Sequence, residues 1–182
     1  FAFHLHLGQR QRRVPERRHG DPVPDQPAGC GADQCRRQRA ARVALGAKDG
    51  HTVSVLREAE SYPGPSLIIA YSHCVAHGYS LSQGLEQQKK AVACGYWPLF
   101  RFDPRRAEKG ENPMKLDSGA PKGSLRDFTA NETRFQMLER INPERSAMLQ
   151  EMAAESVKER YALYQQMAAS MEPVAETQTP NA

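Results

Sequence analysis

The stretch YPGPSLIIAYS (residues 62–72) decides how this chain folds. Its first four residues favour turns and end any preceding helix. The apolar residues 67–71 then run continuously instead of alternating with polar ones, which predicts a strand covered on both faces. Helical spacing is visible before the turn, over residues 52–60, and after the strand, over residues 82–94. The pattern indicates an α/β fold, in which a parallel sheet is flanked by helices.

Further elements follow this unit along the chain. A second strand is expected over residues 97–102, joined to the first by the helix 82–94 in a right-handed crossover. Residues 103–130 carry six scattered Gly and Pro residues and little periodicity, which predicts an ordered excursion over the surface. The sequence TANE at 129–132 has the spacing of a capping box, so helices are expected from there to about residue 171.

Composition divides the chain into four parts. Residues 1–41 form a basic segment, residues 42–130 the α/β part, residues 131–171 the C-terminal helices, and residues 172–182 a polar tail. From residue 4 to residue 61 there is no Phe, Tyr or Trp, and the first Ile is Ile68. The basic segment therefore has little with which to build a core, and we expect it to be disordered.

The basic charge of the chain is confined to that first segment. The formal net charge is +4, yet residues 1–42 hold nine Arg and no Lys, while the remainder is near neutral. Arg without Lys, mixed with Gln, Pro, Gly and Ala, is typical of GC-rich coding DNA translated in the wrong frame. The alternative is a genuine basic arm that binds phosphates in a nucleic acid.

The four cysteines define the candidate metal chemistry. They are Cys30, Cys35, Cys74 and Cys94, and no two have the C-x-x-C spacing of a zinc or complete iron–sulfur site. Cys94 falls in the last turn of the helix 82–94 and is expected to be a buried, inert thiol. Cys74 comes just after a buried strand, where α/β sheets present ligands, although composition alone favours a core cysteine there too.

Two histidines flank Cys74 in the same segment. His73 and His77 are four residues apart, a spacing that would bring two imidazoles together on a helix. Gly78 and the preceding strand argue against a helix at this point, so loop histidines engaged in hydrogen bonds are the default interpretation. No phosphate-binding glycine loop, catalytic triad or carboxylate pair is visible elsewhere.

Longer motifs carry a resemblance to a known family. The stretches LREAESYPGPSLIIAYSHC (56–74), GYWPLFRFDPR (95–105) and NETRF (131–135), with Asn112-Pro113 and Leu116-Asp117-Ser118 between them, closely resemble the C-terminal part of pyruvate:ferredoxin (flavodoxin) oxidoreductases. The resemblance covers about residues 42–170 and does not extend into residues 1–41.

The resemblance implies a fragment of a thiamine-diphosphate-binding fold and a role in oxidative decarboxylation of pyruvate to acetyl-CoA. It implies thiamine diphosphate with Mg²⁺, [4Fe-4S] clusters, coenzyme A, and transfer of electrons to ferredoxin or flavodoxin, in a homodimer. Cofactors of this kind supply the difficult chemistry while the protein positions them. In the family, the cysteine at the Cys74 position is the fourth thiolate of one cluster, and the other three come from an upstream domain.

This sequence also departs from the family pattern. The Gly-Asp-Gly magnesium motif and the Asn-Thr-Gly-Gly segment near the thiazolium are absent, so no catalytic or thiamine-binding residue is assigned. We expect the chain to be inactive alone. With no export signal and no apolar run near the ~20 residues of a membrane span, we expect a cytoplasmic protein. Two alternatives remain: a nucleic-acid-binding module using the Arg-rich segment, and a non-catalytic interaction piece using the helices 131–170.

Overall fold

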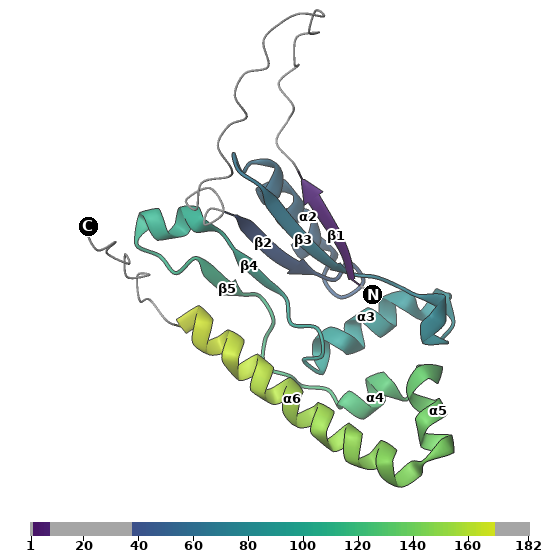
Figure 1. Cartoon of the computed structure of the whole chain (residues 1–182). Helices are drawn as coiled ribbons and strands as arrows, with labels where there is room; N and C mark the ends of the chain where they lie inside the picture. The colour runs from purple at the N-terminus through teal and green to yellow at the C-terminus, as the bar shows by residue number, and fades with distance from the viewer. Residues whose placement is uncertain (1, 8–37, 170–182) are drawn as a thin grey trace, which may run out of the picture.

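A computed structural model describes residues 2–7 and 38–169. It contains one five-stranded sheet with the strand order β1-β3-β2-β4-β5 (Figure 1). The strands are β1 (Ala2–Leu7), β2 (Arg39–Val43), β3 (Ser66–Tyr71), β4 (Phe100–Phe102) and β5 (Met114–Leu116). Strands β2 and β3 are parallel, whereas β1 pairs with β3, β4 with β2, and β5 with β4 in antiparallel fashion. The sheet is therefore mixed.

Helices surround the sheet and extend away from it. They are α2 (Asp49–Glu60), α3 (Gly84–Ala93), α4 (Leu125–Thr129), α5 (Thr133–Ile141) and α6 (Pro143–Ala169), with 3₁₀ turns at Val75–His77, Leu81–Gln83 and Pro104–Lys109. In Figure 1, α2 lies behind β2 and β3, while α6 extends from α5 to the β5 edge of the sheet. None of the described helices is long and apolar enough to cross a bilayer.

The α/β class is confirmed, but the expected parallel sheet and crossover are wrong. The parallel unit is β2-α2-β3, and β2 lies between β3 and β4. Because β4 is antiparallel to β2, α3 does not connect two neighbouring parallel strands. The sequence Arg39-Ala40-Ala41-Arg42-Val43 contains no long apolar run, so the predicted boundary at residue 42 divides this strand. Its small residues let α2 pack closely.

The expectation of disorder over residues 1–41 also needs correction. Residues 2–7 form β1 on the outer edge of β3, and residues 39–41 belong to β2. Pairing with an existing strand supplies backbone hydrogen bonds that do not depend on aromatic or branched side chains. Residues 8–37, and with them most of the basic segment, lie outside the described residues, as does the predicted tail 172–182.

One face of the sheet packs against α2. Along β2, Arg39, Ala41 and Val43 are buried, whereas the residues between them are half-buried, as a strand with two unequal faces requires. The core on the α2 side consists of Ala41, Val43, Val55, Ala59 and Ile68. On β3, Leu67 and Ile69 point to the other face and are only half-buried. Among the described residues, only Ser66 and Ile68 of β3 are buried, both on the α2 face, so the expected burial of both faces is wrong.

The region 103–130 is more regular than its sequence indicated. It contains β5, whose Met114 is the register partner of Phe102 in β4, and the short helix α4. A three-residue strand is too short to leave a periodic pattern, so it could not be found from hydropathy. The C-terminal helices are confirmed as α5 and α6, with a break at Asn142 and Pro143.

Candidate functional site

The Cys74 loop, residues 72–80, leaves the carboxyl end of β3. Cys74 is a free cysteine and is half-buried. Its carbonyl oxygen accepts a hydrogen bond from the backbone N–H of His77 at 3.0 Å, and the N–H of Gly78 donates to the carbonyl of Val75 at 3.0 Å. Cys74 is therefore the residue that opens a single 3₁₀ turn, which places its thiol beyond the end of a buried strand.

Gly78 closes this turn in a conformation that only glycine adopts readily. Its φ is +74°, and a Cβ added there would lie 2.5 Å from the Cβ of Thr133. The hydroxyl Oγ1 of Thr133 donates to the Gly78 carbonyl at 2.6 Å, and the Thr133 N–H points at the same oxygen from 3.4 Å. The first residue of α5 thus holds the end of the Cys74 loop directly.

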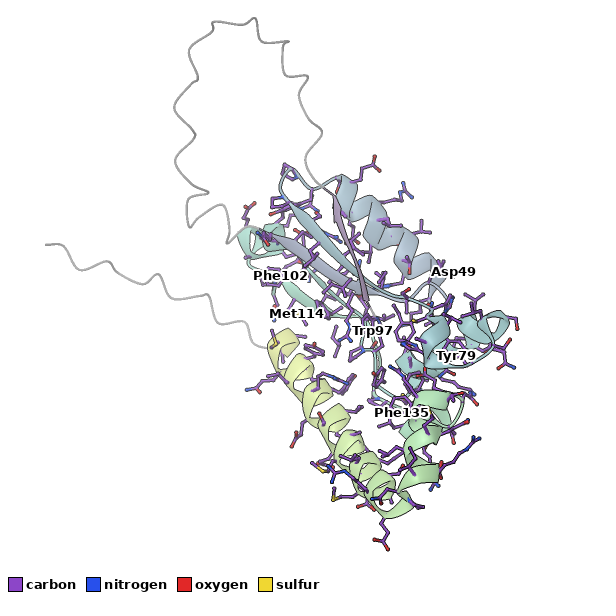
Figure 2. All side chains as sticks on the ribbon, turned by 45° about the vertical axis from the view of Figure 1, so that its right-hand side comes forward. Asp49, Tyr79, Trp97, Phe102, Met114 and Phe135 are labelled. Atoms are coloured by element: carbon purple, nitrogen blue, oxygen red, sulfur yellow. The ribbon has the colours of Figure 1, made fainter. Side chains whose placement is uncertain are left out.

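The other side of the loop rests on α3. The imidazole of His73 occupies the space beside Gly84, where an added Cβ would come within 2.4 Å of His73 Cε1. The hydroxyl of Tyr79 lies 3.5 Å from Nδ1 of the same imidazole. Figure 2 shows Tyr79 near α3, on the same side of the molecule as Phe135 of α5. The Cys74 loop is therefore bracketed by two helices.

A buried carboxylate fixes these helices relative to each other. Glu132 is fully buried at the start of α5. Its Oε1 accepts from Nε2 of Gln87 in α3 at 2.9 Å, and its Oε2 accepts from Nε of Arg134 at 2.5 Å. The Gln87 amide also donates to the carbonyl of Phe128 in α4 at 2.9 Å. A buried charge is tolerated only with such partners, so this cluster joins α3, α4 and α5 rigidly.

The two histidines near Cys74 point into different environments. His77 is 5% exposed, and its Nδ1 has no partner among the described residues. Burial first, and the Arg134 guanidinium second, lower the pKa of His77. His73 instead stays exposed against α3. In the described part of the chain, no three His, Cys, Asp or Glu side chains are grouped to hold a metal ion.

The remaining cysteines differ from Cys74. Cys94 is 3% exposed, and its Sγ lies 3.5 Å from the carbonyl oxygen of Ala91. Burial raises the pKa of this thiol. This is the environment of an inert core cysteine, as its place in the helix predicts. Cys30 and Cys35 lie outside the described residues.

Sequence reasoning missed a charged network between α2, β4 and the segment after β5. Arg101 Nη1 contacts Glu58 Oε1 at 2.5 Å, and its Nε and Nη2 bond the two Asp117 oxygens at 2.8 and 2.7 Å. His51 Nε2 lies 3.0 Å from Asp117 Oδ2. Burial alone would raise the pKa of Asp117, but hydrogen bonds from His51 and Arg101 outweigh it and lower the pKa to about 2.

This charged network, Glu58, Arg101, Asp117 and His51, joins α2 to β4 and to the segment after β5. It has the character of a structural ion-pair cluster, because each charge is used by another member of the same cluster. Its members come from three separated segments, with His51 and Glu58 both on α2, and Asp117 was visible only as part of a family-like motif. No spacing rule could have grouped them.

Comparison with known proteins identifies relatives of this chain. No family model matches. Pyruvate-flavodoxin oxidoreductases of Rhodospirillum rubrum and Trichormus variabilis are 53% identical over 128 residues and 49% over 129, which is 70% and 71% of this chain. The pyruvate:ferredoxin oxidoreductase of Moorella thermoacetica is 42% identical over 128 residues, 70% of the chain.

The length of these relatives limits what the similarity covers. The chain spans about a tenth of each, since the match accounts for 11% of their length. Identity of 42–53% over a continuous stretch of this size is far above what unrelated sequences share. Over that stretch, the chain therefore belongs to the family of pyruvate-flavodoxin and pyruvate:ferredoxin oxidoreductases.

Proposed function

We propose that this chain is the part of a pyruvate-flavodoxin or pyruvate:ferredoxin oxidoreductase in which Cys74 supplies one thiolate ligand to a [4Fe-4S] cluster. The observation that carries the proposal is the placement of a free, half-buried thiol just beyond β3, on a loop held from both sides. Thiolate is the preferred donor to iron–sulfur clusters. A cysteine needed only for packing would lie in the core, as Cys94 does.

The residues present can supply one of the thiolate ligands that such a cluster needs. The Cys74 loop offers a single thiolate, and the described residues contain no group of three metal-ligating side chains. Three further cysteines would have to come from another part of a longer polypeptide. His77 lies three residues from Cys74, and its buried Nδ1 has no hydrogen-bond partner among the described residues, so the loop keeps a polar atom that none of them uses.

For the complete enzyme we propose the reaction in which pyruvate and coenzyme A give acetyl-CoA, CO₂, one proton and two electrons. Thiamine diphosphate with Mg²⁺ would supply the chemistry of decarboxylation, and [4Fe-4S] clusters would carry the electrons singly to ferredoxin or flavodoxin. The names of the relatives support the electron acceptors. A homodimeric assembly and a cytoplasmic location belong to the same proposal.

The contribution of this chain to that reaction would be positional. The turn after Cys74 would fix the position of its half-buried thiol. Helices α3 and α5 would limit the access of water to one side of the loop. No described residue matches a thiamine-binding motif, so we expect the chain by itself to bind no thiamine diphosphate and to turn over no pyruvate. Calorimetric titration with thiamine diphosphate and Mg²⁺ measures this directly.

The proposal is tested in a full-length relative that carries both cysteines. Replacing the residue at the Cys74 position with Ser should remove or convert one cluster, because a cluster left with three thiolates loses a ligand. The same substitution at the Cys94 position is the matched control and should leave all clusters intact. Iron content and low-temperature electron paramagnetic resonance are the measurements. Unchanged spectra in the Cys74→Ser enzyme would refute the assignment.

Of the two alternative roles, nucleic-acid binding gains no support from the described residues. Arg39, which lies in the Arg-rich segment and is the first residue of β2, is fully buried and bonds Glu58 at 2.6 Å, so it is not available to phosphate. The interaction role is favoured by apolar side chains on α5 and α6 that are exposed, among them Ile141, Met137 and Met152. A second copy of the chain is the simplest occupant, and sedimentation at several concentrations detects it.

A further inference from the structure

We propose that Thr133 is a positioning residue for Cys74, acting through the carbonyl of Gly78. This inference rests on the proposed role of Cys74 as a cluster ligand. It concerns a contact that joins residues 55 positions apart, the hydrogen bond of 2.6 Å from Thr133 Oγ1 to Gly78 O. Neither residue would touch the cluster itself.

The position of Gly78 constrains that of Cys74, because a single short turn joins the two residues. Cys74 and Gly78 flank one 3₁₀ turn, and both of its backbone hydrogen bonds run between residues 74–78. A turn this short has few internal degrees of freedom, so fixing its last carbonyl fixes the direction in which its first residue points. The thiol at the start of the turn is thereby set by the contact at its end.

Thr133 is itself immobile for a reason independent of the loop. It follows Glu132, which is fully buried and bonded to Gln87 and Arg134. The Thr133 side chain, by contrast, is exposed, so packing does not demand a threonine there. The Thr133 hydroxyl donates a hydrogen bond to the Gly78 carbonyl. Thr133 can come this close to Gly78 because glycine has no side chain.

Such a contact matters for a cluster because ligand geometry must be held closely. Groups one shell beyond a metal ligand orient it, and their loss commonly lowers metal affinity by about 10- to 100-fold. Thr133 would act one step further out than such a group, because it bonds Gly78, whose N–H in turn bonds the carbonyl of Val75 next to Cys74. A loosened turn would let the thiolate leave the iron more often, which would appear as faster loss of iron and not as a change in the ligand set.

The first test uses this chain without any cluster. Hydrogen exchange of the His77 and Gly78 amides, followed by mass spectrometry, should become about fivefold faster in Thr133→Val, because one hydrogen bond that holds the turn is lost. Thr133→Ser keeps the hydroxyl and should restore slow exchange; Thr133→Ala serves if the valine variant does not fold. Ser124→Ala, which removes the N-cap bond of α4, should leave these two amides unchanged. Equal exchange in the wild-type and Thr133→Val chains would overturn the inference.

The second test uses a full-length relative with the same residues at these positions. Iron release to a chelator should be about tenfold faster in the Thr133→Val enzyme than in the Thr133→Ser enzyme, with the same number of clusters at the start. The Cys74→Ser enzyme separates the two proposals. If it keeps every cluster, the proposed function is wrong; if it loses one while Thr133→Val releases iron at the wild-type rate, only the positioning role is wrong.

Discussion

The charged network under α2 and the Cys74 loop are both polar, but they are stabilised in opposite ways. The charged network is built on full charges, with Arg101 between the carboxylates of Glu58 and Asp117, and the His51 imidazole contacts Asp117. The Cys74 loop is held by neutral hydrogen bonds and by the fit of glycine against Thr133 and His73. The first region joins α2 to β4, whereas the second holds a thiol beyond the end of β3.

This difference indicates what each region is suited to do. Partly buried charges bind strongly to one another, but their contribution depends on pH and fails as a unit when one member is removed. Neutral bonds and close backbone approach are weaker and do not depend on pH near neutrality. A loop built in the second way keeps its shape when the charge beside it changes, which suits a residue proposed to hold a redox group.

The largest effect is expected from Arg101→Leu in the charged network. Removing the guanidinium leaves Arg39 as the partner of Glu58 and His51 as the partner of Asp117, and we expect the free energy of unfolding to fall by about 3 kcal/mol. Urea denaturation measures the loss. The control is Arg126→Leu, since Arg126 is 77% exposed and its pair with Glu139 spans 3.6 Å; it should change stability by less than about 0.5 kcal/mol. Similar losses in both variants would contradict the distinction.

A smaller loss is expected from Gly78→Ala in the Cys74 loop. The variant must accept a positive φ and also the contact with Thr133, which together should cost about 2 kcal/mol. Gly110→Ala is a matched control, because Gly110 has a φ of +71° but open space around the added Cβ. It should cost about 1 kcal/mol. Thermal unfolding measures the loss of stability in both variants. Equal losses would show that Thr133 moves aside for the added methyl group at no cost in stability.

The pH dependence of stability should come from the charged network. The pKa of Asp117 is about 2 in the folded chain against an ordinary value of 3.8, so its carboxylate contributes stability above about pH 4. That contribution, about 2 kcal/mol, is lost as pH falls from 4 through 2. Urea titrations at successive pH values should show a shallower decline in Asp117→Asn. An identical decline in both proteins would assign the acid sensitivity to other groups.

The smallest effect compares the two described cysteines in the isolated chain. Cys94→Ser places a hydroxyl in the core and should lower the free energy of unfolding by about 1 kcal/mol. Cys74→Ser, at a half-buried loop position, should change it by less than about 0.5 kcal/mol. Chemical denaturation of both variants provides the comparison. A larger loss at Cys74 would mean that its thiol serves packing, which would weaken its proposed role as a ligand.

The elements predicted correctly are those with a strong local pattern. The continuous apolar run placed β3, and helical spacing placed α2, α3, α5 and α6 close to their observed limits. Two missed strands lack such a pattern: β2 reads Arg-Ala-Ala-Arg-Val without a continuous apolar run, and β5 is three residues long. Both become strands because a neighbouring strand offers backbone partners, and that information is not local.

The candidate site divides in the same way. The position of Cys74 after β3 followed from the sequence, and its proposed role from the resemblance. The contact between Thr133 and Gly78 could not be predicted, because it joins distant residues through the packing of α5 against the loop. The grouping of Asp117 with Arg101 and His51 could not be predicted either, because it also joins residues from separate segments of the chain.

By itself, then, the sequence determined the α/β class, the place of β3 and the thiol that follows it, since apolar runs and turn residues act over a few neighbouring positions. Only the tertiary structure decided the mixed strand order, the burial of Ser66 and Ile68 on the α2 face of β3, and the partners of Gly78 and Asp117. Those features depend on which distant segments meet. Strand pairing and buried polar contacts are chosen by the whole chain, because each requires a complementary group that no local pattern specifies.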